Sequence, residues 1–183
     1  MDIQFAILGF LSWQPYAGYD LKKAISESDL FYWSGNNNQI YKGLVALHQA
    51  GLVSQDVQPQ ESLPARKVYT ITPQGRDALR AWLLTEPELP EFRDNFLIQL
   101  AWSEPLSPFE LDALLGRYEE EVSVQLRMRL AQSGAGTAPR RSPREAYLWA
   151  RIDENMRSWW QHELAWVRDV RAELSSEGYL QKE

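Results

Sequence analysis

The first fifty residues place hydrophobic positions at helical spacing. Residues 3–12 are largely apolar and predict a buried first helix, which Tyr16-Ala17-Gly18 interrupts. A second, amphipathic helix is predicted over residues 19–28, because apolar and basic residues take opposite sides of it. Its apolar side holds Leu21, Ala24 and Ile25, and its basic side holds Lys22 and Lys23.

A third helix is predicted to begin near Asn37 and to end before Gly51. At about 100° of rotation per residue, its apolar positions fall within one narrow arc and a polar line lies opposite. The inner arc holds Ile40, Leu44 and Leu47, and the outer line holds Asn38, Lys42 and Gln49. Asn36 or Asn37 suits the N-cap, and Gly51 suits the C′ position that ends a helix. The outward face is therefore rich in amides, with a single lysine.

Two strands and a fourth helix follow. One strand lies around residues 53–57, and the alternation of residues 67–72 predicts a second strand after a loop that prolines close at both ends. Thr72-Pro73 then begins a helix, with a capping threonine and a proline at the first helical position. The inner stripe of that helix consists of Ala78, Leu79 and Trp82. This order of elements predicts a winged helix-turn-helix with a two-stranded wing.

Two further helices are predicted in the second half of the chain. Ser107 to Glu110 and Ser142 to Glu145 are capping boxes with proline at the first helical position. They predict long helices over about 107–132 and 142–174. The last helix keeps an apolar 3–4 spacing throughout, at Trp149, Ile152, Met156, Trp159, Trp160, Leu164, Val167, Val170 and Leu174. A helix of about 30 residues is roughly 45 Å long, which exceeds the width of a small domain. We therefore expect a partner subunit to cover its apolar stripe.

The acidic, proline-rich stretch 86–90 predicts a domain boundary. We therefore expect a winged helix domain over residues 1–86 and an all-helical dimerisation domain over residues 87–183, in a mainly α fold. The first carries seven Lys and Arg against eight Asp and Glu, and the second carries twelve against seventeen. The acidity thus lies mostly in the second half.

Composition indicates a soluble globular protein, with 44% hydrophobic and 24% charged residues. The chain has no run of about 18 apolar residues and no basic n-region, so neither a membrane span nor a signal peptide is predicted. It has no cysteine, which excludes disulfides, thiolate catalysis and zinc–thiolate sites. We expect a cytoplasmic location and no membrane partner. The net charge of −6 does not favour general affinity for nucleic acid, but it leaves room for a local basic face.

Enzymatic chemistry has little support in the sequence. His162-Glu163 resembles the start of a zinc-protease motif, but Trp166 stands where the second histidine is needed. The run Glu119-Glu120-Glu121 is more typical of an exposed helix face than of acid–base machinery. The sequence contains no phosphate loop and no dinucleotide fingerprint. We therefore expect no enzyme, no metal site and no cofactor.

The sequence resembles the PadR family of transcriptional regulators, in its larger subgroup with a long helical C-terminal domain. The resemblance covers nearly the whole chain and is carried by AILGFL, GYDL, QIYKGLVALHQAGLV and ARKVYTITPQGRDAL. Its most specific part is Ile40-Tyr41, followed at wing distance by residues 66–73 and Gly75. In the second half, FRDNFLIQLAWSEPLSPFELDALL and HELAWVRDVRAEL are similar to the helical domain.

The resemblance implies a homodimeric repressor that binds an inverted-repeat operator of double-stranded DNA. A small-molecule effector, often aromatic, that releases the DNA is typical of such families. By position, Gln39, Tyr41 and Lys42 would face the DNA, with Arg66 and Lys67 near the wing. The chain departs from the usual pattern at Asn36-Asn37-Asn38, which is often more basic or hydroxylated, and at the neutral to acidic wing tip.

Amide and cationic side chains suit different parts of a DNA duplex. Asparagine and glutamine can bond bidentately to adenine, whereas cations bind phosphates. We expect the third helix to contact DNA through Asn37 and Asn38, with Gln39, Tyr41 and Lys42 added by the resemblance. Lys42 suits either a guanine or a phosphate, and phosphate contacts are expected from Lys22, Lys23, Arg66 and Lys67. The asparagines have a second interpretation, in which they only cap the helix and permit a turn.

The tryptophans also have two interpretations. The dimerisation residues are predicted to be Trp149, Ile152, Met156, Trp159, Trp160, Val167 and Val170. Trp33, Trp82, Trp102 and Trp149 either pack in the ordinary way or line an aromatic ligand pocket. The alternative function is a winged-helix protein–protein interaction module without DNA binding, which the acidic balance favours.

Overall fold

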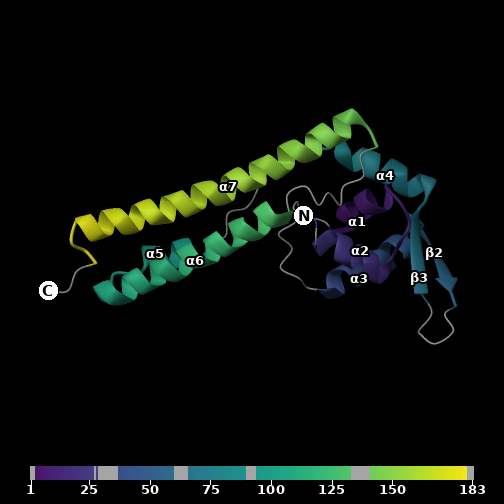
Figure 1. Ribbon diagram of the computed structural model, residues 1–183. Helices are drawn as coiled ribbons and strands as arrows, with labels where there is room; N and C mark the ends of the chain where they lie inside the picture. The colour runs from purple at the N-terminus through teal and green to yellow at the C-terminus, as the bar shows by residue number, and fades with distance from the viewer. Residues whose placement is uncertain are drawn as a thin grey trace. The chain divides into compact units, whose positions relative to one another are not determined.

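The computed structural model describes residues 3–26, 28, 37–59, 66–89, 94–132 and 141–180. The chain forms two compact units, Met1–Glu88 and Leu89–Glu183. Figure 1 shows the helices and strands of each unit with their labels. Because each unit has a hydrophobic core of its own, the two are described separately.

The first unit is a winged helix-turn-helix. Its helices are α1 (Ile3–Leu11), α2 (Gly18–Ser26), α3 (Asn37–Gln49) and α4 (Pro73–Leu83). Its strands are β1 (Tyr16–Ala17), β2 (Val53–Gln58) and β3 (Arg66–Ile71), which form an antiparallel sheet in the order β1-β3-β2. The fold prediction is confirmed, with one addition. Tyr16 and Ala17, predicted only to interrupt a helix, pair with Tyr69 and Val68 of β3 as a third strand.

The core of the first unit lies between α1, α2, α3 and the sheet. It contains the inner arc predicted for the third helix, Ile40, Leu44 and Leu47, which are at most 3% exposed. Gly43 lets α3 approach α1 closely, because a Cβ there would lie 2.8 Å from Ile7 Cδ1. The apolar arc of α3 is therefore used entirely for packing, and its polar line faces away from this core.

The end of α3 lies against the start of α4, although two strands separate them in the chain. Residues 51–52 and 72–75 form this corner. Gly51 has a φ of 71° and ends α3 as the sequence predicts. The Gly51 N–H donates to the His48 carbonyl at 3.0 Å, and the Leu52 N–H donates to the Leu47 carbonyl at 2.9 Å. This pattern is the Schellman motif, which satisfies carbonyls at the helix end.

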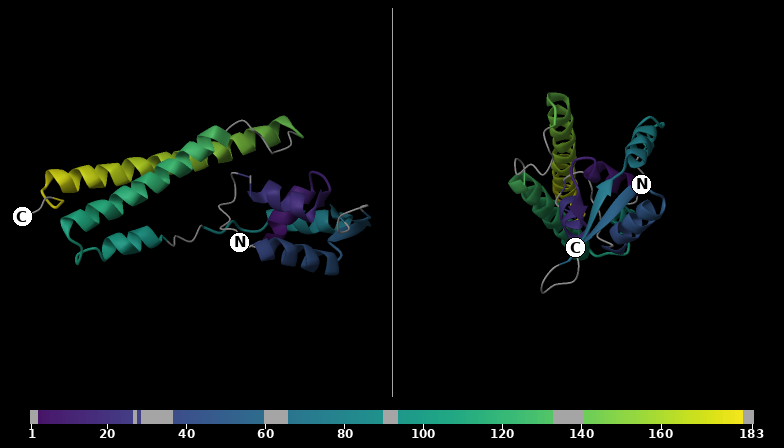
Figure 2. Two further views of the ribbon diagram at one scale, coloured as in Figure 1. Left: turned by 60° about the horizontal axis from the view of Figure 1, so that its bottom comes forward. Right: turned by 90° about the vertical axis from the view of Figure 1, so that its right-hand side faces the viewer.

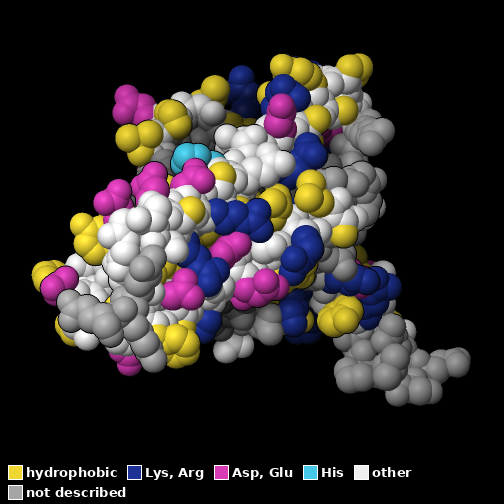
Figure 3. Space-filling model, turned by 60° about the vertical axis from the view of Figure 1, so that its left-hand side comes forward, with side chains coloured by type: hydrophobic (Ala, Val, Ile, Leu, Met, Phe, Trp, Pro, Cys, Tyr) yellow, Lys and Arg dark blue, Asp and Glu magenta, His cyan; other side chains and the backbone are white. Residues whose placement is uncertain are grey.

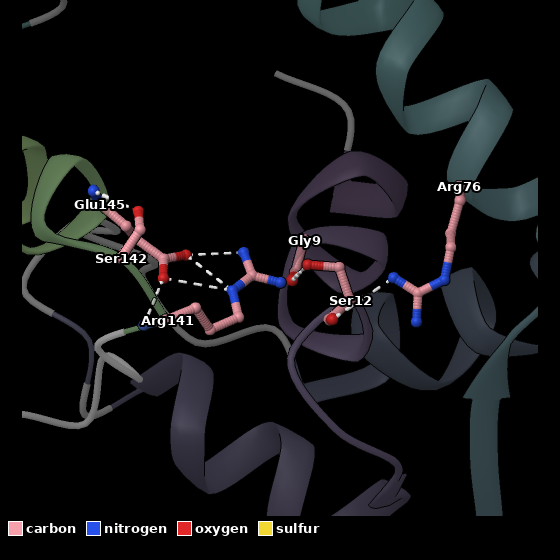
Figure 4. A network of polar contacts seen from close by, with 6 residues as sticks. All are labelled: Gly9, Ser12, Arg76, Arg141, Ser142 and Glu145. Atoms are coloured by element: carbon pink, nitrogen blue, oxygen red, sulfur yellow. Dashed lines mark hydrogen bonds and ion pairs between the residues drawn. The ribbon is translucent and has the colours of Figure 1, made fainter.

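Thr72 connects that corner to α4. Its hydroxyl accepts from the Gly75 N–H at 3.0 Å, as an N-cap, and donates to the Gly51 carbonyl at 2.8 Å. The Thr72 N–H donates to the Leu52 carbonyl at 3.1 Å. Gly75 has no room for a side chain, because a Cβ there would lie 2.1 Å from the Leu52 carbonyl oxygen. The glycine is what allows α4 to begin against this turn. In the same unit, an Arg76 N–H donates to the Ser12 carbonyl at 3.5 Å (Figure 4).

The second unit contains α5 (Asn95–Ala101), α6 (Pro108–Gln132) and α7 (Pro143–Ser176). Helices α6 and α7 lie side by side and run antiparallel, as Figures 1 and 2 show. Both predicted serine N-caps are present. The Ser107 hydroxyl accepts from the Glu110 N–H at 3.3 Å, and the Ser142 hydroxyl accepts from the Glu145 N–H at 3.1 Å.

The start of α7 is reinforced by an ion pair that the sequence did not predict. The Glu145 carboxylate accepts from the Arg141 guanidinium at 2.6 Å and from the Arg141 backbone N–H at 2.9 Å (Figure 4). A carboxylate in the first turn of a helix also lies near the positive end of the helix dipole. This N-terminus is therefore held by both a neutral cap and a charged one.

Aromatic packing and a partly buried polar contact join the three helices of the second unit. The Phe96 ring stacks on the Tyr118 ring with centroids 3.5 Å apart, and α5 is attached to α6 there. The Tyr118 hydroxyl donates to the Glu163 carboxylate of α7 at 2.8 Å. Burial, followed by that hydrogen bond, raises the pKa of Tyr118 well above its usual value.

Ion pairs link α6 to α7 near the C-terminal end of α7. Arg171 donates to both oxygens of Asp112, at 2.7 and 2.9 Å, and to Glu119 at 3.2 Å. Arg168 donates to Glu119 at 2.8 Å. The hydrogen bond from Arg171 lowers the pKa of Asp112, and the hydrogen bond from Arg168 lowers that of Glu119. Figure 3 shows basic and acidic side chains intermixed on one face, with hydrophobic side chains between them.

The apolar stripe of α7 has two parts. Trp160, Leu164 and Val167 are buried in the core of the second unit, and Val170 packs on that core. Trp160 and Val167, which were predicted as dimer contacts, instead pack against α6 of the same chain. Trp149 and Met156 are half-buried, whereas Ile152 and Trp159 are 37% and 40% exposed. No helix in the described part of the chain is both long and apolar enough to cross a membrane.

Candidate nucleic-acid interface

The outward face of α3 is the candidate interface. Asn38, Gln39, Tyr41, Lys42 and Gln49 are all exposed on it. Asn37 begins the helix, while Asn36 lies outside the described residues, so the N-cap prediction for it stays a prediction. The structure adds a residue that the sequence analysis did not select. Val45 is 50% exposed and lies on the same line as the predicted polar residues.

Tyr41 lies close to the start of α2. A Cβ on Gly18 would lie 2.9 Å from Tyr41 Cε1, so the glycine allows the ring to lie against the start of α2. Burial raises the pKa of Tyr69 on β3, and the charge of nearby Tyr41 raises it further. Tyr41 is still 44% exposed. Its ring thus lies against the start of α2 and remains accessible.

The basic residues predicted to contact phosphates lie on two elements. Lys22 is half-buried and Lys23 is exposed, both on α2. Lys67 is exposed on β3, where it pairs with Val57 of β2. These lysines come from segments on either side of α3 in the sequence, and the fold places them in the same unit as its outward face.

Arg66 differs from the lysines because it already has an anionic partner. Its Nη2 lies 2.5 Å from Asp20 Oδ2, and both side chains are about half exposed, at 47% and 46%. The pair joins the start of β3 to the first turn of α2. Sequence spacing gives no sign of this contact, because the two residues are 46 positions apart. In this structure the ion pair of Arg66 connects the wing strand β3 to helix α2 of the helix-turn-helix.

The proposed ligand-pocket tryptophans belong to different units. Trp82 on α4 stacks on Phe5 of α1, with ring centroids 4.7 Å apart and planes within 7°. Trp102, at the end of α5, is 79% exposed, and Trp149 on α7 is half-buried. Trp33 lies outside the described residues. Packing accounts for Trp82, and a shared pocket stays a prediction.

The chemistry of the α3 face suits the edges of nucleic-acid bases. Side-chain amides offer paired donors and acceptors, a hydroxyl offers both, and a lysine offers a cation. These groups match what base pairs present in the major groove, which is wide enough to admit a helix. The lysines on neighbouring elements match the phosphate backbone.

Comparison with known proteins relates the first unit to one family. Residues 7–81 match the model of the Transcriptional regulator PadR-like family. The chain is also 30% identical, over 113 residues, to the Negative transcriptional regulator PadR of Bacillus subtilis. Residues 7–81 therefore contain a PadR-like domain. The alignment with that relative covers 61% of this chain and 62% of the relative, which is less than two thirds of its length.

Solved PadR structures share the fold along almost the whole chain. The crystal structure of Bacillus subtilis PadR in complex with operator DNA has a TM-score of 0.77, at 21% identity, over 94% of this chain and 98% of that one. The crystal structure of the same protein in complex with p-coumaric acid has a TM-score of 0.74, at 22% identity, over 96% and 99%. The PadR match spans α3, the sheet and Gly75, so the corner described above lies inside the matched region.

Proposed function

We propose that this protein is a PadR-type transcriptional repressor that binds a specific double-stranded DNA operator as a homodimer in the cytoplasm. The observation that carries the proposal is the outward face of α3, where polar side chains are exposed while the apolar arc is used in the core. The match of residues 7–81 to the model of a family of transcriptional regulators supports it. So does the likeness of the fold to a PadR solved on operator DNA. The proposed function involves no catalysis.

The exposed part of α7 supports a dimer. Ile152 and Trp159 remain more than a third exposed on a helix of 34 residues. Apolar side chains of this size, left uncovered on one helix, suit the self-complementary contact of a two-fold dimer. In such a dimer two α3 helices can enter successive major grooves, about 34 Å apart. An inverted-repeat operator follows from that symmetry.

A titration with DNA tests the proposal. Labelled DNA from the region upstream of the protein's own gene should bind more tightly than scrambled DNA of equal length. Both affinities must be measured at the same salt concentration, because DNA binding depends steeply on salt. A protein–protein interaction module, the alternative function, would show no difference between the two DNAs. Equal affinity for both sequences would therefore contradict the proposal.

Two variants separate base readout from phosphate contact. Asn38→Ala should cost about 1–3 kcal/mol on the preferred site and little on scrambled DNA. Lys67→Ala should weaken binding to both DNAs and lower the salt slope by roughly one for each lost phosphate contact. If the two variants behaved alike on both DNAs, the division between readout and phosphate contact would be wrong.

A small aromatic acid is the proposed effector. Its support is the relative solved with p-coumaric acid and the tryptophans of this chain. Such a ligand should quench tryptophan emission and weaken operator binding together, because one coupling free energy links the two sites. Quenching without any change in DNA affinity would show that the ligand site is incidental.

A further inference from the structure

Val45 is an exposed aliphatic residue in the middle of a polar face. Its side chain is 50% exposed. On a helix, residues three and four positions apart are neighbours. Its neighbours on one side are Tyr41 and Lys42, and its neighbours on the other are His48 and Gln49, all of which are exposed. An apolar side chain thus stands where each surrounding group is polar or amphipathic.

The fold does not account for this valine. It is outside the hydrophobic core of the first unit, which takes its α3 contacts from Ile40, Leu44 and Leu47. Valine is also a poorer helix former than alanine or the long polar residues. Isolated exposed hydrophobic residues are common on proteins. This one, however, lies at the centre of the surface that the proposed function brings against DNA.

The major groove offers an apolar side chain one particular target. Among the four bases only thymine presents a methyl group there, at C5, while the other edge groups are hydrogen-bond donors and acceptors. An aliphatic side chain placed against a donor or acceptor would leave that group without a partner, which is costly. Against the thymine methyl it buries apolar surface instead.

We infer that Val45 reads the C5-methyl of a thymine in each half-site of the operator. The inference rests on the proposed DNA binding and names the base that one position recognises. Asn38, seven residues earlier on the same line, is suited to adenine. Seven residues of helix span about 10 Å, or roughly three base-pair steps. The thymine should therefore lie within about three base pairs of the base that Asn38 contacts.

Deoxyuridine provides a direct test, because it pairs as thymidine does and lacks only the methyl group. Operator sequences are first enriched from random DNA with the wild-type protein, and each thymine is then replaced in turn. One thymine position in each half-site should respond. Replacing that thymine in a single half-site should weaken binding about fourfold, as expected for one buried methyl group. Replacement in both half-sites should weaken binding about fifteenfold.

Two variants assign the effect to Val45. Val45→Ala should bind thymine and uracil operators equally, and it should fold, because the site is exposed and alanine favours helix. Val57→Ala is the matched control, since Val57 is 49% exposed on β2. It should keep the full preference for thymine. If wild-type protein and Val45→Ala lost the same affinity with uracil, or if uracil never mattered, the inference would be overturned. If no sequence were enriched at all, the proposed function itself would fail.

Discussion

Replacing Gly75 by alanine tests the corner where the end of α3 meets the start of α4. The new Cβ would lie 2.1 Å from the Leu52 carbonyl oxygen and 2.9 Å from Ile71 Cγ1. An unstrained C···O contact is about 3.3 Å or longer, so α4 must move by roughly 1 Å. That movement would stretch the two hydrogen bonds through which Thr72 joins Gly51 and Leu52.

The expected cost follows from these contacts. Overpacking costs about 2 kcal/mol and the two hydrogen bonds about 1 kcal/mol each. Alanine stabilises a helix by about 1 kcal/mol relative to glycine, which offsets part of this cost. The first unit should therefore lose about 3 kcal/mol of its free energy of unfolding. Urea unfolding of the full chain, followed by circular dichroism and tryptophan fluorescence, would measure the loss.

Gly9 supplies the control for this experiment. It also lies in a helix, α1, but a Cβ there would meet nothing within 4 Å. Gly9→Ala should stabilise the first unit by about 0.5–1 kcal/mol, because only the backbone entropy term remains. A Gly75→Ala protein as stable as the wild type would refute the close approach of α4 to Leu52.

Three further predictions concern the second unit and its assembly. Asp112 and Glu119 have lowered pKa values, so their ion pairs should stabilise the α6–α7 pair fully above about pH 4.5 and lose this effect as the pH falls through the lowered values. Asp112→Asn and Glu119→Gln should flatten that dependence in urea unfolding between pH 2 and 6, while Glu120→Gln should leave it unchanged. Replacing Ile152 and Trp159 together by serine should produce a folded monomer by light scattering, and a dimer that survives the change would place the interface elsewhere. The same double variant should bind single half-site DNA about as well as wild type, since each α3 face stays intact.

The sequence predicted those elements whose signals are local. Thr72-Pro73 and the two serine capping boxes begin helices where expected, because a cap needs only residues within one turn. The outward line of α3 was also predictable, since helical rotation alone separates it from the core. Val45 was not predicted, because only polar side chains indicate base contacts by their chemistry, although helical rotation places it on the same line.

The features that escaped prediction depend on distant partners. Strand β1 has only two residues, too few for any alternation, and it exists because β3 offers an open edge. The pairing of Asp20 with Arg66 and the covering of Trp160 by α6 both join residues far apart in the chain. A periodic apolar stripe shows that a helix is covered, and it does not show whether the chain itself or a second subunit covers it.

Helix α3 keeps its structural and its surface residues on separate sides, and this separation bears on how such a regulator can evolve. Ile40, Gly43, Leu44 and Leu47 hold the helix in place, whereas Asn38, Lys42 and Val45 make no part of the core. Substitutions at exposed sites usually change stability by less than about 0.5 kcal/mol. If α3 binds DNA as proposed, new target sequences can be acquired by changing a few outward side chains while the rest of the fold is unchanged. The same separation means that the outward residues of α3 can be exchanged together in an engineered protein without changing its core.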